Sequence, residues 1–520
     1  MNLCTREQMQ EMDRQTIEEV GISGLVLMEI AGRSAASALH EHLITTYETP
    51  PLRAGIFCGS GNNGGDGYVI ARHLDSLGYD VDVLMVARPE SIEGDAWTNL
   101  EILRRLSPNI IILQDLLEDI TVESLQDLLP PYEIYVDALL GTGLKGDVSG
   151  PCFHTIKYLN EALGFKFAVD IPSGLNANTG KTLGVSFKAD LTCTLGMAKN
   201  GLFLQHGRQI AGKTLVADIG ILPETENSVG IQGELLTRKS METVCYPRAR
   251  HSHKGMLGHL GVIAGSKTMP GAAVLATGGA VSSGVGLISV YTAADVQQPL
   301  IGRFPEAMLL PLLPDFGELS ENQLIDLERF LEEKSTLVIG PGLGLEPMVS
   351  ALVSSVLQTA HIPVVIDADG LTALAGDMSP LYETLCPVVL TPHPGEMARL
   401  TGVDATQGME DPVQWALSLA QQYRCYVVLK CATTILASPD GRYAVNSTGN
   451  PGMATGGSGD VLSGLLGGLM ASGVPPWDAA RLAIYLHGIA GDLAAEKSGF
   501  RALRALDIME QLSHALAEFE

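Results

Sequence analysis

The sequence predicts an α/β protein with two doubly wound domains, each a mostly parallel sheet covered by helices on both faces. The chain has 520 residues, more than one core usually organises. Short apolar runs alternate with helix-length amphipathic stretches, as they do in βαβ units. This alternation fails near residue 230 and then resumes. We therefore expect one domain over residues 1–225 and a second over residues 235–520.

The N-terminal half begins with two helical stretches, expected at residues 5–20 and 25–43. An amphipathic helix at 65–78 is set among apolar strands at 54–58, 81–86, 133–140, 165–171 and 191–196. Because these strands are apolar throughout, they fit a parallel sheet that is buried on both faces. Residues 222–254 are polar and broken by proline and glycine, so the domain boundary is expected near residue 230.

The C-terminal half again alternates short apolar runs with helix-length stretches. Apolar strands and the loops after them are expected at 259–266, 287–293, 336–342, 363–371, 387–396 and 426–436. Helices are expected at 270–284, 346–360, 460–473, 476–496 and 503–518. These elements predict a second doubly wound layer that ends in a helix-rich region.

Composition restricts the partners of this chain. The formal net charge of −26 argues against a basic surface for nucleic acid or anionic membranes. The eight cysteines include no CxxC pair, and the polar start MNLCTREQMQEMDRQ lacks the apolar run of a signal peptide. Residues 461–474 are apolar but too short and too rich in glycine to span a bilayer. We expect a soluble, cytoplasmic protein that binds small molecules and neither nucleic acid nor membrane.

A glycine-rich loop follows the first expected strand. Residues 59–67 read GSGNNGGDG and lead into a helix, where backbone N–H groups and the helix dipole can hold a phosphate. Gly59, Gly61 and Gly64 also fit GxGxxG. Asp80 then lies at the spacing of a ribose-binding acidic residue, so a nicotinamide-dependent dehydrogenase is one alternative. The same glycine spacing recurs in GTGLKG further along the domain, so it is weakly specific.

Side-chain oxygens gather around this loop. Asn62, Asn63 and Asp66 belong to it, and they favour a cation or a hydroxyl-rich ligand over a plain dinucleotide turn. Acidic and hydroxyl groups also follow two later strands, in VDALLGTGLKGD and AVDIPSG. Ligands of an open α/β sheet bind at the carboxyl ends of its strands, so we expect a site there. Taken singly, such residues more often form turns or helix caps.

The segments GNNGGDG, VDALLGTGLKG and DIPSG together resemble the NAD(P)H-hydrate epimerase domain, over roughly residues 1–220. The resemblance implies a Rossmann-like three-layer sandwich that interconverts the R and S forms of hydrated NADH and NADPH. It implies that the substrate is bound by Asn62, Asn63, Gly64, Gly65, Asp66, Gly141, Thr142, Gly143, Leu144, Lys145, Gly146, Asp147 and Asp170. It also implies a potassium ion held by Asn63, Asp137 and Ser173. We assign proton transfer at C6 to Asp170, because exchange of the C6 oxygen substituent needs acid–base help.

A second glycine-rich loop, residues 449–468, reads GNPGMATGGSGDVLSGLLGG and continues into a helix. Its GGSG turn can stabilise charge on a transferring phosphoryl group, and Asp460 can take a proton from an attacking hydroxyl. A Walker A motif is missing, since GSKT at 265–268 has serine where glycine should precede the lysine. Taken alone, Asp460 is also compatible with a helix N-cap.

Three further loops follow apolar strands, in IGPGLG, TPHPGEMARL and LKCATTI. With GGSGD they resemble the ribokinase-like ADP-dependent NAD(P)H-hydrate dehydratase, over roughly residues 235–520. The resemblance implies that Asp460 is the catalytic base and also binds substrate, in a pocket lined by Ala272, Ala273, Gly342, Gly344 and His393. It implies nucleotide contacts from Lys430, Cys431, Ala432, Thr433, Thr434, Gly456, Gly457, Ser458 and Gly459. Magnesium and ADP are the implied cofactors. Cys431 departs from the glycine that this family usually has after the lysine.

The two resemblances describe consecutive steps of one repair task, which predicts a bifunctional enzyme that restores NADH and NADPH from their hydrates NADHX and NADPHX. AMP and phosphate are the expected products from ADP, and a homo-oligomer is the expected assembly. Two alternatives come from other classes. The C-terminal half could be a small-molecule kinase that releases a stable phosphoester, and the N-terminal half could be a ligand sensor without catalytic activity.

Overall fold

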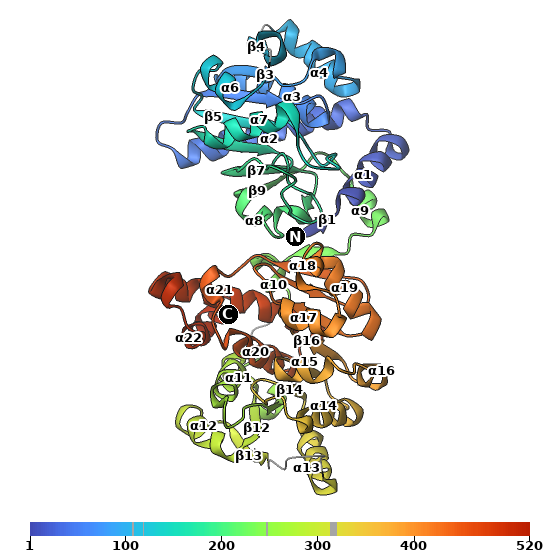
Figure 1. The fold of residues 1–520 in the computed structure, drawn as a ribbon, viewed down its shortest axis with the longest axis vertical. Coiled ribbons are helices and arrows are strands. Elements are labelled where there is room, and N and C mark those ends of the chain that lie inside the picture. Colours follow the sequence, from blue (N-terminus) through green and yellow to red (C-terminus); the bar gives the residue numbers. More distant parts are fainter. Residues whose placement is uncertain (107–108, 118, 246–247, 313–319, 520) are drawn as a thin grey trace. The chain divides into compact units, whose positions relative to one another are not determined.

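A computed structural model describes residues 1–520 except 107–108, 118, 246–247, 313–319 and 520 (Figure 1). The chain divides into two compact units, Asn2–Gly233 and Glu234–Glu520, the second of which also includes Met1. Within residues 222–254, which were expected to be irregular, the described part includes three short elements: α9 (Pro223–Val229), β10 (Gly233–Leu235) and α10 (Arg238–Glu242).

The N-terminal unit is built on a parallel sheet in the order β4-β3-β2-β5-β6-β7-β9. Its strands are β2 (Arg53–Cys58), β3 (Asp80–Met85), β4 (Asn109–Ile112), β5 (Ile134–Ala138), β6 (Phe165–Val169), β7 (Leu191–Leu195) and β9 (Lys213–Ala217). β2 pairs with β3 on one side and with β5 on the other, so the strand order reverses between β2 and β5. Ligands bind at the carboxyl ends of the strands next to such a reversal. A small parallel pair, β1 (Asn2–Cys4) and β8 (Ala198–Lys199), lies outside this sheet.

Helices cover both faces of the N-terminal sheet, as expected for a three-layer sandwich. One core joins α2 (Gly24–Thr46), α3 (Asn62–Ser76) and α4 (Gly94–Arg105) to side chains such as Ile56. The other joins α5 (Leu113–Leu116), α6 (Val122–Leu128) and α7 (Gly150–Glu161) to the next residue, Phe57. Neighbouring residues of β2 thus enter opposite layers, which is the alternation of a strand buried on both faces. The remaining helices are α1 (Arg6–Gln15), continued by a π-helical turn at Thr16–Val20, and α8 (Gly207–Ile210).

The C-terminal unit has its own sheet, in the order β13-β12-β11-β14-β15-β16-β17-β18-β19. The strands β11 (His259–Ile263), β12 (Leu287–Ala293), β13 (Met308–Leu312), β14 (Thr336–Ile339), β15 (Val364–Ile366), β16 (Val388–Leu390) and β17 (Tyr426–Leu429) are parallel. β18 (Thr434–Ala437) and β19 (Tyr443–Asn446) continue the sheet in antiparallel pairs. The α/β prediction is confirmed, with an antiparallel extension that the apolar runs did not reveal.

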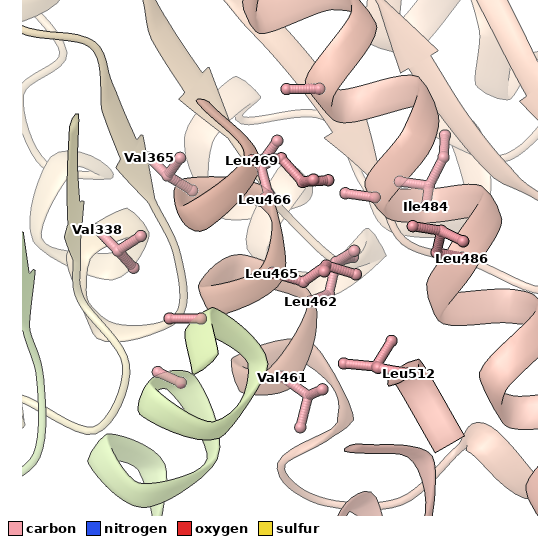
Figure 2. Packing of buried hydrophobic residues seen from close by; sticks show 14 of the residues in the cluster. Val338, Val365, Val461, Leu462, Leu465, Leu466, Leu469, Ile484, Leu486 and Leu512 are labelled. Atoms are coloured by element: carbon pink, nitrogen blue, oxygen red, sulfur yellow. The ribbon is translucent and has the colours of Figure 1, made fainter. Parts of the chain in front are cut away.

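The helices of the C-terminal unit include a tightly packed group at the end of the chain. After α10, the helices of this unit are α11 (Pro270–Ser283), α12 (Gln297–Arg303), α13 (Glu321–Glu332), α14 (Pro347–Thr359), α15 (Asp369–Leu374), α16 (Pro380–Glu383), α17 (Pro394–Thr401), α18 (Ala405–Gly408), α19 (Pro412–Tyr423), α20 (Ser458–Ala471), α21 (Pro476–Ala502) and α22 (Ala505–Ala517). The packed group consists of α20, α21 and α22 together with α11. Figure 2 shows α20 inside this group, with Leu465 and Leu466 among side chains from β14, β15, α21 and α22. The apolar stretch after Asp460 is therefore a core helix. Across the described residues, no helix combines the length and the hydropathy needed to cross a membrane.

Close contact between α11 and α20 depends on glycine at position 464. A β-carbon there would lie 1.9 Å from the carbonyl oxygen of Ala276, which belongs to the backbone of α11. Gly464→Ala is therefore expected to push the helices apart and to lower the free energy of unfolding of the C-terminal unit by about 1–3 kcal/mol, the usual effect of overpacking. Denaturant titration followed by circular dichroism measures this loss.

Gly302→Ala is the matched control, because a β-carbon at Gly302 in α12 has open space around it. This variant is expected to be neutral or slightly stabilising, since alanine is the better helix former. Equal stability of the two variants would contradict the proposed role of Gly464.

Candidate active sites

The N-terminal unit has a cavity of about 710 Å³ at the carboxyl edge of its sheet. The loop after β2, the start of α3 and the loop after β5 form one side of it, and α1 and α2 contribute residues to the rest. The cavity brings together nine of the residues predicted to bind substrate: Asn62, Asn63, Asp66, Gly141, Thr142, Gly143, Leu144, Lys145 and Asp170. The start of α3 adds unpaired backbone N–H groups and the positive end of a helix dipole, so this cavity suits an anionic ligand.

Four predicted substrate residues do not line the cavity. Gly64 and Gly65 lie inside the first turn of α3, where they face the backbone of Gly59 and the side chain of Met28. Gly146 and Asp147 are exposed beyond the part of the loop that reaches the cavity. Packing of the helix start thus explains the first two glycines, whereas Gly146 and Asp147 have no contact with the cavity in this structure.

The three predicted potassium ligands are all buried: Asp137 and Ser173 form a hydrogen-bonded pair, and Asn63 lines the cavity from the first turn of α3. The carboxylate of Asp137 accepts hydrogen bonds from the Ser173 amide (2.7 Å) and from the Ser173 hydroxyl (2.6 Å). Burial raises the pKa of Asp137 to about 6. Asn63 is 7% exposed, and both atoms of its side-chain amide are buried without a hydrogen-bond partner among the described residues. Buried polar atoms normally have partners, so this amide has spare capacity for a ligand or a cation.

Asp170 directly follows β6. Its backbone conformation is unusual, and the hydrogen bonds to its carboxylate all go to one of the two oxygens. Its φ of 65° is uncommon outside glycine. One oxygen, Oδ1, accepts hydrogen bonds from the Leu195 amide (3.0 Å), the Thr194 hydroxyl (3.3 Å) and the Lys199 ammonium (2.5 Å). These donors all use Oδ1. Within the part of the chain that the structure describes, Oδ2 is left for a ligand in the cavity that Asp170 lines. This arrangement suits a group that exchanges a proton with a bound molecule.

Three further charged residues of this cavity, Asp13, Asp95 and Lys199, were not predicted from the sequence. Lys199 is buried and also donates to the Leu195 carbonyl (2.7 Å), and Asp13 reaches the cavity from α1. Burial, opposed by the charge of Lys199 and reinforced by that of Asp170, raises the pKa of Asp13 to about 6. Burial, followed by the charges of Asp170 and Asp13, raises the pKa of Asp66 well above its usual range. Neither Asp13 nor Lys199 stands in a recognisable motif, so no local signal could have indicated them.

The dehydrogenase alternative is wrong about Asp80. This residue begins β3, so it lies at the amino end of a parallel strand, whereas the glycine loop lies at the carboxyl end of β2. A ribose-binding acid must stand near the loop that holds the phosphates. Asp80 is instead exposed and lies 3.7 Å from the guanidinium of Arg53. The matching glycine spacing therefore does not report a nicotinamide-dehydrogenase site.

The C-terminal unit places its predicted residues at the carboxyl ends of β14, β16 and β17, in the first turn of α11 and at the start of α20. Gly457, with φ 91°, precedes this helix, and Asp460 lies in its first turn. The carboxylate of Asp460 has no hydrogen-bond partner among the described residues. Burial, together with the charge of Asp367, raises the pKa of Asp460 to about 7. A carboxylate of this kind can accept a proton near neutral pH beside a turn that can hold a phosphate.

Lys430 lies at the end of β17, where its ammonium is 2.6 Å from Asp367 and 4.0 Å from Glu396. Burial disfavours its charge, but the charges of Asp367 and Glu396 outweigh this effect and leave the pKa of Lys430 above its usual value. A β-carbon at Gly459 would lie 3.0 Å from the ammonium, so Lys430 stands against the glycine turn. The lysine is thus held by the protein beside the turn that we predicted to bind nucleotide.

The rest of the predicted nucleotide loop, residues 431–434, is held by a hydrogen bond within the loop. The thiol of Cys431 donates to the carbonyl of Thr433 (2.8 Å), and burial raises its pKa to about 11. Thr434 begins β18, and Ala432 lies between Cys431 and Thr433 in the connecting turn. The cysteine that departs from the family pattern is therefore accommodated within its own loop, as a neutral thiol.

His393 precedes α17 and serves as its N-cap. Its Nδ1 accepts from the amides of Gly395 (3.0 Å) and Glu396 (3.4 Å), so the ring proton belongs on Nε2. Burial, followed by the charge of Lys430, lowers the pKa of His393 and keeps the ring neutral. About half of the side chain remains exposed, and its Nε2 lies 3.5 Å from a carboxylate oxygen of Glu396.

Only one of the two predicted alanines can face a ligand through its side chain. Ala273 is fully buried in the core. Ala272 is partly exposed and lies next to Gly342, where a β-carbon would come within 2.6 Å of it. The amide of Gly344 donates to Asp369 (2.8 Å), which fixes this loop after β14. Of the pair, Ala272 is therefore the candidate for the substrate pocket.

Comparisons with known proteins match a family to each of the two units. Residues 260–514 match the family described as NAD(P)H-hydrate dehydratase, and residues 24–201 match the family described as YjeF-related protein N-terminus. A bifunctional NAD(P)H-hydrate repair enzyme from Moorella thermoacetica is 40% identical over 522 residues, covering 100% of this chain and 97% of its own. One from Coxiella burnetii is 35% identical and covers 98% of each chain.

Among solved structures, an ADP/ATP-dependent NAD(P)H-hydrate dehydratase from Bacillus subtilis, co-crystallised with ATP and Mg²⁺, is 34% identical. It covers 55% of this chain and 99% of its own, with a TM-score of 0.50. A ribokinase-like superfamily protein from Enterococcus faecalis also has a TM-score of 0.50, at 28% identity, and covers 55% of this chain and 96% of its own. With relatives alike over their full length, the chain belongs to the family of bifunctional NAD(P)H-hydrate repair enzymes.

Proposed function

We propose that this chain repairs hydrated NADH and NADPH in two steps. The N-terminal unit interconverts the R and S hydrates, and the C-terminal unit dehydrates the S form at the expense of ADP, giving AMP and phosphate. One observation carries the proposal: each unit sets a carboxylate, Asp170 or Asp460, beside a glycine-lined helix start at the carboxyl edge of its sheet. The family membership of the whole chain supplies the substrate.

In the epimerase reaction, the start of α3 holds the anionic part of the substrate, and Asp170 exchanges protons at the C6 oxygen substituent. Its Oδ1 is committed to the Leu195 amide and to Lys199, so Oδ2 is the oxygen that meets the substrate. Inversion requires this substituent to leave one face and return to the other, which a positioned carboxylate assists in both directions.

Potassium fits the oxygen donors of the N-terminal site. Asn63 has a buried amide without a partner, and Asp137 is a buried carboxylate with no cationic side chain in contact among the described residues. A monovalent cation held by Asn63, Asp137 and Ser173 would compensate that charge and supply a positive centre for the anionic substrate. A hydrogen bond connects the substrate loop after β5 to these potassium ligands: the Leu140 amide donates to the Ser173 hydroxyl (2.8 Å).

In the dehydratase reaction, the substrate hydroxyl attacks the terminal phosphorus of ADP, Asp460 takes the hydroxyl proton, and AMP leaves. The phosphate then leaves the substrate carbon while the neighbouring ring carbon gives up a proton to solvent, and the double bond formed between them restores the reduced nicotinamide. Backbone N–H groups of the turn from Gly456 to Gly459 stabilise the charge on the transferring group. Magnesium, present with ATP in the Bacillus subtilis crystals, would accompany the nucleotide phosphates here as well.

A nucleotide-dependent assay on separated R and S hydrates tests the proposal. The full chain with ADP and magnesium should consume the S hydrate rapidly and an R/S mixture completely, with release of inorganic phosphate. An R hydrate that stays unconsumed would remove the epimerase assignment. A stable phosphorylated product would favour the small-molecule kinase instead.

Potassium is expected to accelerate epimerisation. Replacing it by tetramethylammonium at constant ionic strength should slow R to S interconversion by about tenfold or more, the size typical when a metal site is disturbed. Potassium should also raise the midpoint of thermal unfolding of the wild-type protein, because it binds only the folded site. Asp137→Asn should abolish that rise. Equal rates and equal midpoints in the two salts would contradict the potassium site.

A further inference from the structure

Asp367 is the most completely enclosed carboxylate of the C-terminal site. It follows β15 and is 1% exposed. It binds the ammonium of Lys430 (2.6 Å) and accepts a hydrogen bond from the Ser463 hydroxyl (2.9 Å). Burial opposes its charge, but Lys430 and these hydrogen bonds outweigh burial, and the pKa of Asp367 is lowered. Asp367 is therefore a permanent negative charge, and it belongs to none of the loops from which we predicted the site.

Both partners of Asp367 reach the start of α20. The Ser463 hydroxyl oxygen lies 3.1 Å from the carbonyl of Gly459 and 3.2 Å from that of Asp460. Lys430 also stands against Gly459, where a β-carbon would lie 3.0 Å from its ammonium and 3.7 Å from the Asp367 carboxylate. Asp367 thus joins the end of β17 to the first two turns of α20, which places the glycine turn and Asp460 relative to Lys430.

The backbone beside Asp367 is strained. Ala368, the next residue, has φ 48° and ψ −116°, a conformation that residues with a β-carbon rarely adopt. Such strain persists only where the surrounding structure requires it. Here it turns the chain from β15 into α15 directly at the buried carboxylate.

Several charged groups face Asp460 from the surrounding elements. The carboxylates of Asp367, Asp369 and Glu396 favour its protonated form, and Lys430 favours its ionised form. Two histidines of the surrounding elements, His393 at the start of α17 and His487, whose ring contacts the Ser458 carbonyl (3.0 Å), both have a lowered pKa, the latter about 4, for which burial is the first cause. After burial, Asp367 has the largest influence on Asp460.

We propose that Asp367 is a positioning residue of the dehydratase reaction: it holds Lys430 and the glycine turn beside Asp460, and its charge sets how readily Asp460 accepts a proton. Asp367 touches no reacting atom in this arrangement. The inference rests on the proposed function, because Asp460 must be the base whose ionisation the assay reports.

The test is the pH dependence of ADP-dependent consumption of the S hydrate by the full chain carrying Asp367→Asn. Activity of a carboxylate base is lost as pH falls through its pKa, and removal of a neighbouring negative charge lowers that pKa. The acid limb of the profile should therefore move to lower pH. On the alkaline plateau, the turnover number should fall by roughly tenfold to a hundredfold because the turn and Lys430 lose their support.

Three companion variants separate charge from shape. Ser463→Ala removes a hydrogen bond to Asp367 but no charge, so its acid limb should stay in place. Lys430→Met removes a positive charge and should move the limb to higher pH. Asp367→Glu keeps the negative charge but has a longer side chain, which cannot keep the same contacts with Lys430 and Ser463. Its turnover number should fall while its acid limb stays in place. This variant tests the proposal if Asp367→Asn does not fold.

Epimerisation of the R hydrate and the midpoint of thermal unfolding report on folding of each variant. An acid limb of Asp367→Asn at the wild-type pH, or a wild-type turnover number in both Asp367 variants, would overturn the proposal. Failure of the wild-type protein itself to consume the S hydrate would overturn the proposed function instead, so the two failures are distinguishable.

Discussion

Asp460→Asn is expected to reduce ADP-dependent dehydration of the S hydrate by about 10²–10⁴-fold, the contribution typical of a general base. Asparagine has nearly the same shape but cannot accept the hydroxyl proton, so the glycine turn should persist. The change acts only in the C-terminal unit, and R to S interconversion should therefore continue at the wild-type rate. Phosphate release measures the first reaction, and chromatography of the two hydrates measures the second.

Asp478→Asn is the matched control for this variant. Asp478 is also a carboxylate in the first turn of a helix, α21, but it pairs with Arg481 (2.8 Å) away from the glycine turn. Its replacement should leave dehydration unchanged. If Asp460→Asn kept the wild-type turnover number at saturating ADP, Asp460 would not be the base, and proton transfer would have to be assigned to another group.

The fold was predictable because parallel strands buried on both faces are apolar along their whole length, and glycine-rich loops mark their carboxyl ends. Asp460, Asn63 and Asp170 were predicted for the same reason, since each lies directly after a strand or in the first turn of a helix that the apolar pattern defines. The resemblance to two enzyme families, and with it the substrate, was carried by these same loops and is confirmed by the full-length relatives.

The residues that sequence reasoning missed reach their sites through tertiary structure. Asp13 comes from α1, and Lys199 from β8, far along the chain from Asp170. Asp367 was visible as a polar residue after a strand, but only the fold shows that it meets Lys430. Asp80 is the opposite case, a residue that matches a sequence pattern but lies away from the site. The spacing rule counts residues along the chain and does not state at which end of a strand they lie.

Asp170→Asn is expected to stop epimerisation, with a fall of about 10²–10⁴ in the rate of R to S interconversion. Asparagine tolerates a positive φ, so the backbone at 65° should be kept. Lys199 retains the Leu195 carbonyl and the Thr194 hydroxyl as acceptors. With ADP and magnesium, an R/S mixture should then lose its S hydrate at the wild-type rate and keep its R hydrate, apart from spontaneous conversion.

Asp190→Asn changes a carboxylate at the opposite edge of the same sheet, where it accepts from the Lys166 amide (2.9 Å), and should leave both reactions intact. Complete consumption of the mixture by Asp170→Asn at the wild-type rate would contradict the assignment. Because each inactive site leaves the other unit unchanged, a mixture of Asp170→Asn and Asp460→Asn proteins should again convert both hydrates completely. In that mixture the S hydrate must pass through solution from one protein to the other. Restored conversion would therefore show that the two reactions do not have to take place on the same protein molecule.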